Sequence, residues 1–114
     1  MRQQEEYKKI MTRMKVWCLT VRIKRNDELH GKRLQNLLID FLMGAKISGA
    51  TLWNGVDGFG KRRRSVIKLE GISFNMPVVI EVIEEKSKLE PLLPQIKRMV
   101  GDNGLATLQE VEVL

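Results

Sequence analysis

The stretch PVVIEVIE, residues 77–84, decides the fold, because apolar side chains fall on both of its faces. The faces divide as Val78, Ile80 and Val82 on one and Val79, Glu81 and Ile83 on the other. Apolar residues in a run bounded by turn signals predict a strand, and Pro77 stands at its first position, where a strand tolerates proline. A strand that is apolar on both faces must be covered on both faces.

Three more strands are expected on either side of this stretch. They are KVWCLTVRIK at residues 15–24, ISGATLWNGV at 47–56 and LATLQEVEVL at 105–114. Gly55 inside the second of these indicates a bulge or a close backbone approach. The last strand has apolar residues in both phases, which predicts a bulge or a change of environment along it.

Two amphipathic helices are expected between the strands. Residues 31–45 place leucines and a phenylalanine at helical spacing. A second helix is predicted to begin at Ser87, where Ser87-Lys88-Leu89-Glu90 matches a capping box. Pro94 should kink or restart that helix, because it removes one hydrogen bond of the ladder.

The order of these elements is β-α-β-β-α-β, which predicts an α+β, ferredoxin-like fold. Its four-stranded sheet is antiparallel, and both helices lie on one face. The other face carries Val79 and Ile83, together with Val16 and Cys18. Apolar side chains on a face without helices favour self-association through that face.

Length and composition limit the remaining possibilities. The chain has 114 residues, a length that predicts a single domain, here at residues 14–114 after an extension at residues 1–13. It contains one cysteine and one histidine. No window is long and apolar enough for membrane insertion, and the N-terminus has no signal-peptide pattern. Cys18 lies in a strand and indicates a reducing, cytoplasmic location, and His30 has no partner for a metal site.

A long basic loop, expected at about residues 57–75, is the most distinctive feature. It begins within GATLWNGVDGFGKRRR, residues 49–64, a stretch that contains four glycines and ends in Lys61 to Arg64. Residues 57–73 carry half of the formal charge of +6. Bare amides followed by cations are typical of an anion site. A hairpin turn with a solvated charge run is the structural alternative.

The sequence shows no arrangement of residues that is typical of a catalytic site. Cys18 and His30 lie on different elements without an orienting carboxylate, and Glu81 and Glu84 fall on opposite faces of one strand. The third strand has no stacking aromatics for RNA, and a metallochaperone would need a CxxC pair. The chain is therefore predicted not to be an enzyme, with nucleic acid disfavoured as a partner. A small-ligand or protein-binding module remains.

The segments GATLWNGVDGFGK, MPVVIEVIEEKSKLEPLLPQI and GLATLQEVEVL resemble the widespread uncharacterised family of PII-like proteins. The resemblance runs from Lys15 to Leu114 and implies a homotrimer. In the related PII signalling proteins, a G-M-T-V strand leads to G-F-G at the base of a signalling loop. Here Gly49-Ala50-Thr51-Leu52 leads to Gly58-Phe59-Gly60-Lys61.

The resemblance implies an adenine nucleotide or a similar anion held between subunits by this loop base and by a second glycine turn, Gly101-Asp102-Asn103-Gly104. The lysine that follows that turn in PII proteins is replaced by Leu105, and the C-terminal arginines are missing. These departures favour AMP or ADP over ATP. The implied ligand-binding residues are Thr51, Gly58, Phe59, Gly60, Lys61, Arg62, Arg63, Arg64, Gly101 and Asp102.

The sequence therefore predicts a trimeric, non-enzymatic sensor whose basic loop acts on an unknown partner protein, with a membrane transporter or an enzyme as candidates. The alternative from another class is a ligand-independent scaffold trimer that docks on an acidic protein or membrane surface. Salt would weaken such docking steeply, and nucleotides would leave it unchanged.

Overall fold

The computed structural model describes residues 15–58, 65–66 and 75–114, and its main layer is a four-stranded sheet. In spatial order, the strands are β4 (Thr51–Asn54), β7 (Pro77–Glu84), β1 (Lys15–Lys24) and β8 (Leu105–Glu112). Every neighbouring pair is antiparallel. This arrangement confirms the predicted ferredoxin-like order, and the bounds of β1 and β7 agree with the predicted ones.

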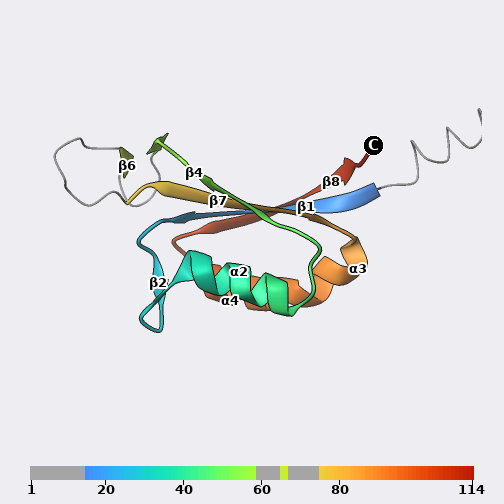
Figure 1. The fold of residues 1–114 in the computed structure, drawn as a ribbon, viewed down its shortest axis with the longest axis horizontal. Coiled ribbons are helices and arrows are strands. Elements are labelled where there is room, and N and C mark those ends of the chain that lie inside the picture. The colour runs from blue at the N-terminus through green and yellow to red at the C-terminus, as the bar shows by residue number, and fades with distance from the viewer. Residues whose placement is uncertain (1–14, 59–64, 67–74) are drawn as a thin grey trace, which may run out of the picture.

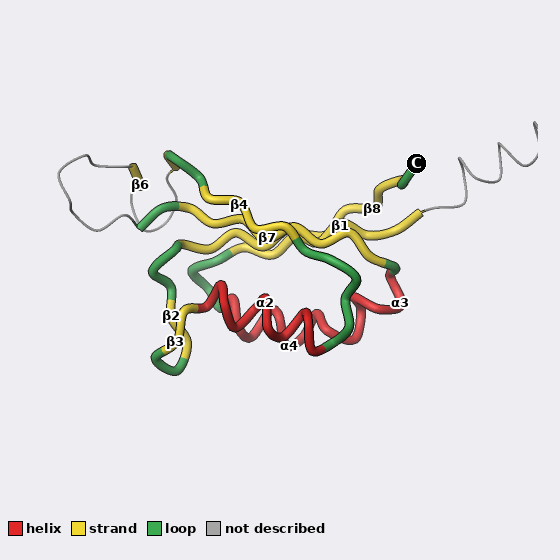
Figure 2. The backbone as a smooth tube through the Cα atoms, in the orientation of Figure 1, coloured by secondary structure: helices red, strands yellow, loops and turns green. Residues whose placement is uncertain are grey.

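The helical layer lies on one side of the sheet. It consists of α2 (Leu34–Gly44), α3 (Lys86–Leu89), the 3₁₀ turn η1 (Glu90–Leu92) and α4 (Leu93–Val100). Figures 1 and 2 show these helices together beneath the sheet, and no described helix on its other side. We call that uncovered side the open face. No helix of the described residues is long and apolar enough to cross a membrane.

The core lies between the helices and the sheet. Leu19 and Val21 from β1 and Ile80 and Val82 from β7 are at most 2% exposed. The helices contribute the remaining buried contacts through Leu34, Leu38, Leu42, Leu89, Ile96 and Val100. Because alternate residues of a strand face opposite ways, these side chains leave the other set of each strand on the open face.

Four short strands add detail that the sequence did not predict fully. β2 (Glu28–Leu29) and β3 (Lys32–Arg33) form a hairpin in the expected connector, and its turn residues His30 and Gly31 have φ of 53° and 77°. β5 (Asp57–Gly58) pairs with β6 (Ser65–Val66) at the base of the basic loop. The other residues of this loop, 59–64 and 67–74, lie outside the described residues.

Several predicted details are wrong. The second helix begins one residue before Ser87, with Glu85 at the N-cap and no side-chain cap hydrogen bond, so no capping box forms. β8 pairs with β1 without interruption, so it has no bulge. Its mixed apolar phases arise because it is an edge strand with both faces partly exposed. The expected restart near Pro94 is confirmed, since α4 begins at Leu93 after the 3₁₀ turn.

Candidate functional site

Four of the ten predicted ligand-binding residues are described, and they lie near the two edges of the sheet. Thr51 is exposed on β4, and Gly58 ends β5 directly beyond it along the chain. Gly101 and the exposed Asp102 lie in the turn between α4 and the opposite edge strand, β8. The remaining six, Phe59, Gly60, Lys61, Arg62, Arg63 and Arg64, lie outside the described residues.

Gly55 fixes where the basic loop leaves the sheet. Its N–H donates to the Pro77 carbonyl at 2.7 Å. A Cβ at this position would lie 3.1 Å from the Pro77 Cβ and 3.2 Å from its carbonyl oxygen. A side chain here would be in unusually tight contact with Pro77, which confirms the close-contact interpretation of Gly55. The loop base is therefore held against the start of β7.

The second glycine turn is clamped onto β1. Gly101 has φ of 64°, a conformation that favours glycine, and its N–H donates to the Lys97 carbonyl at 3.0 Å. A Cβ at Gly104 would approach Val100 Cγ1 to 2.5 Å and the Arg22 carbonyl oxygen to 3.0 Å. The turn therefore enters β8 with its backbone packed directly on Arg22.

The loop base and the glycine turn lie at the same end of the sheet. Along β1, Lys24 pairs with Pro77 of β7, and Arg22 pairs with Leu105 of β8. The two features nevertheless stand at opposite edges. Three strand spacings separate those edges, which is about 14 Å.

A shallow hollow on the open face surrounds Thr51. It has a volume of about 370 Å³ and is lined by Ser48, Gly49, Ala50, Thr51, Glu81 and Ile83. Thr51 pairs in register with Glu81 of β7, which places a hydroxyl and a carboxylate on the same row of the sheet. The hollow thus offers hydrogen-bonding groups beside the apolar side chain of Ile83. It is open to solvent within one chain.

Glu84 holds the segment that leads into this hollow. Its Oε2 accepts hydrogen bonds from the Ser48 N–H at 3.0 Å and the Ser48 hydroxyl at 2.7 Å, and its Oε1 accepts one from the Glu85 N–H at 3.0 Å. Lys88 Nζ lies 3.9 Å from Oε1. These hydrogen bonds, led by those from Ser48, lower the pKa of Glu84 from 4.5 to about 2.

Sequence reasoning missed this role of Glu84. The signal for it was present, because Glu84 continues the phase of Val78, Ile80 and Val82, which face the helices. A carboxylate in a buried phase needs donors nearby. Ser48 supplies two of the three, so β7 and the chain entering β4 are tied together at this end.

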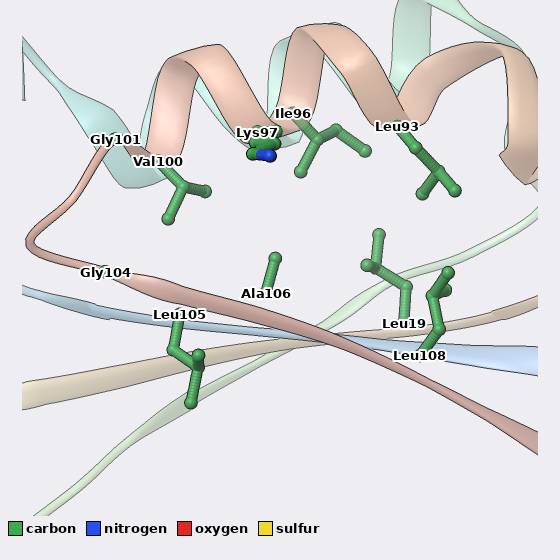
Figure 3. A pocket seen from close by; sticks show the side chains of 10 residues that line it. All are labelled: Leu19, Leu93, Ile96, Lys97, Val100, Gly101, Gly104, Leu105, Ala106 and Leu108. Atoms are coloured by element: carbon green, nitrogen blue, oxygen red, sulfur yellow. The ribbon is translucent and has the colours of Figure 1, made fainter.

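An apolar groove lies between α4 and β8 on the helical side. Figure 3 shows Ile96 and Val100 from the helix facing Ala106 and Leu108 from the strand, with Leu105 directed away from them. The groove has a volume of about 400 Å³. Because α4 covers β8 incompletely, Leu108 keeps 41% of its surface exposed.

The open face carries several large apolar side chains that are exposed to solvent in the single chain. Trp53, Ile83 and Leu105 retain 57%, 45% and 54% of their surface. They share this face with the half-buried Cys18. Among the described residues, no cluster of histidine, cysteine, aspartate or glutamate could hold a metal ion.

Comparison by sequence places residues 16–113 within the model of the family DUF190, described as "Uncharacterized ACR". A UPF0166 protein of Aquifex aeolicus is 31% identical over 97 residues, covering 84% of this chain and 90% of the relative. The UPF0166 protein MJ1524 of Methanocaldococcus jannaschii is 26% identical over 100 residues, covering 88% and 93%.

Solved structures show the same fold at low sequence identity. CPII from Thiomonas intermedia K12, a nitrogen regulatory PII-like protein bound to ADP, AMP and bicarbonate, matches with a TM-score of 0.68. The identity is 15%, covering 87% of this chain and 88% of CPII. A PII-like signaling protein from Thermus thermophilus matches with a TM-score of 0.62 at 14% identity, covering 89% and 91%.

Proposed function

This chain belongs to the DUF190 family and has a PII-like fold, and from that premise we propose that it is a non-enzymatic regulatory protein that binds an adenine nucleotide between subunits. One observation carries the proposal: the loop base and the glycine turn stand at opposite edges of one sheet. Neither edge encloses a ligand alone. A ring of copies brings the β4 edge of one subunit to the β8 edge of the next and completes the site.

Burial of the apolar side chains on the open face favours the assembly of several copies. Trp53, Ile83 and Leu105 lie on this face, and packing them against other copies removes apolar surface from water. A homotrimer is the assembly that the resemblance to PII proteins implies. Thr51 and the hollow around it then lie at a subunit boundary, where the neighbouring glycine turn, Gly101 and Asp102, supplies amides.

The bound nucleotide in CPII is consistent with this proposal. AMP or ADP is the proposed ligand here, since Leu105 stands where PII proteins carry a lysine. Phe59, Gly60 and the cations Lys61 to Arg64 are proposed to complete the anion site. Ligand contacts would then order the basic loop, which a partner protein, such as a membrane transporter or an enzyme, recognises.

Light scattering after size-exclusion chromatography tests the assembly. The unmodified chain should elute with the mass of three copies, and Ile83→Asp should give monomers, because it puts a charge on the open face. Met43→Asp is the matched control, since Met43 is 70% exposed but lies on α2. A monomeric unmodified chain, or dissociation by both variants alike, would contradict the proposed interface.

Isothermal titration calorimetry with AMP, ADP, ATP and cyclic AMP tests the ligand. Heat with AMP or ADP and a weaker response to ATP is the expected pattern. The absence of heat with every nucleotide would exclude nucleotide sensing and leave the scaffold alternative.

A further inference from the structure

Arg22 is a cation on the open face that the sequence analysis did not assign to any site. It lies on β1 in the same phase as Cys18 and Thr20, whereas its neighbours Val21 and Ile23 face the core. The side chain is exposed in the single chain. In the described part of the chain, no carboxylate forms an ion pair with it.

The surroundings of Arg22 make it costly to cover without an anion. Its register partners are Val79 on β7 and Leu105 on β8, both apolar, and Trp53 lies beyond Val79 in the same row. When other copies cover this face, the guanidinium loses water, and an unpaired buried charge is strongly unfavourable. An anion must therefore accompany the assembly at this point.

The backbone beside Arg22 already favours an anion. The glycine turn packs on the Arg22 carbonyl through Gly104. Among the described residues, no acceptor lies at hydrogen-bonding distance from the amides of Asp102 and Asn103. Arg22 lies opposite Leu105, which directly follows the glycine turn. Its guanidinium can donate two parallel hydrogen bonds to the oxygens of a phosphate group.

We propose that Arg22 binds the phosphate of the nucleotide, supplying from the neighbouring strand the cation that Leu105 does not provide. This inference rests on the proposed nucleotide function. Glu81 is the competing counter-ion, since it lies on the next row of the open face, opposite Thr20. In the single chain, the carboxylate of Glu81 makes no hydrogen bond or ion pair with any described residue, so it does not pair with Arg22.

The test compares AMP with adenosine, which differ only in the phosphate. Calorimetry of Arg22→Gln should show AMP binding about 10- to 100-fold weaker, as expected for one charged hydrogen-bonded pair, with adenosine binding unchanged. Arg22→Lys should recover part of the AMP affinity. Arg98→Gln is the matched control, because Arg98 lies on the exposed side of α4, where it donates to Gln95 Oε1.

The outcomes separate the two proposals. Unchanged AMP binding by Arg22→Gln, or equal losses for AMP and adenosine, would overturn the role of Arg22 while leaving the nucleotide function intact. A third outcome is that Arg22→Gln and Glu81→Gln both lose the trimer, while the trimers that still assemble bind AMP with unchanged affinity. That outcome would show that Arg22 forms an ion pair with Glu81, and it would also overturn the role of Arg22 in phosphate binding. An unmodified chain that binds no nucleotide would overturn both proposals.

Discussion

Replacing Glu84 with glutamine should destabilise the fold without changing its shape. Glu84 is 7% exposed and accepts three hydrogen bonds, two from Ser48 and one from Glu85. Glutamine has the same size but offers one acceptor oxygen, and its NH₂ would face a donor. A buried donor left without an acceptor costs about 1–3 kcal/mol. We expect Glu84→Gln to lose about 2 kcal/mol of unfolding free energy at pH 7.

The pH dependence gives an independent check on that magnitude. The pKa of Glu84 falls from 4.5 to about 2 on folding, so its contribution is complete above pH 4.5 and disappears as the pH falls toward 2. A full shift of this size corresponds to about 3 kcal/mol, which is of the same order as the loss expected for Glu84→Gln. The variant should lack this part of the acid-induced loss.

Urea denaturation at several pH values, at one fixed protein concentration, measures both effects. Fixed concentration is needed because assembly adds to apparent stability. Glu85→Gln is the control, since it removes the same charge from an adjacent exposed side chain. Equal unfolding free energies for Glu84→Gln and Glu85→Gln at pH 7, with parallel profiles down to pH 2, would refute the role given to Glu84.

Three further substitutions test other contacts by the same denaturation measurement. Gly104→Ala should lower the unfolding free energy by about 1–3 kcal/mol, because the new Cβ would overlap a neighbouring side chain. Gly44→Ala is its control, since a Cβ there meets nothing within 4 Å, and it should leave the unfolding free energy unchanged or raise it by up to about 1 kcal/mol. Lys86→Met should lower the unfolding free energy by about 0.5–1 kcal/mol, since Lys86 Nζ lies 5.1 Å from the ring centre of Trp17. Equal stability of the variant and the unmodified chain would show that this cation–π contact does not stabilise the fold. Ile80→Val should cost about 1 kcal/mol, because Ile80 is fully buried, and a loss below about 0.3 kcal/mol would indicate a loosely packed core.

The central strands could be predicted because burial dominates them. β1 and β7 each have two strand neighbours, so their apolar runs specify both type and bounds. At the periphery, local turn chemistry decides. The β2–β3 hairpin turns through His30 with positive φ, a conformation that residues other than glycine seldom adopt. A histidine therefore gives little indication of such a turn in the sequence. The second helix begins beside Glu85 because the carboxylate of Glu84 holds the Glu85 N–H there.

The candidate site was predictable only where glycine is required. A Cβ at Gly104 would overlap Val100, and one at Gly55 would be in unusually tight contact with Pro77. Glycines inside a strand or a turn mark such positions in the sequence. Arg22 and Glu84 were missed because the period of a strand shows which face a residue occupies, but not which groups lie opposite. Their partners, Leu105 and Ser48, are distant in sequence and become neighbours only through the sheet order.

The alternation of strands in the sheet has a consequence for how the chain can be divided. Each of the three ladders joins a strand from before the basic loop, β1 or β4, to one from after it, β7 or β8. Neither the part of the chain before the basic loop nor the part after it contains both strands of any ladder of this sheet. A protease that cuts the chain between β6 and β7 would thus yield two peptides that each lack every ladder of the four-stranded sheet. The two peptides would be complementary along all three ladders, as in a split protein whose activity returns on mixing.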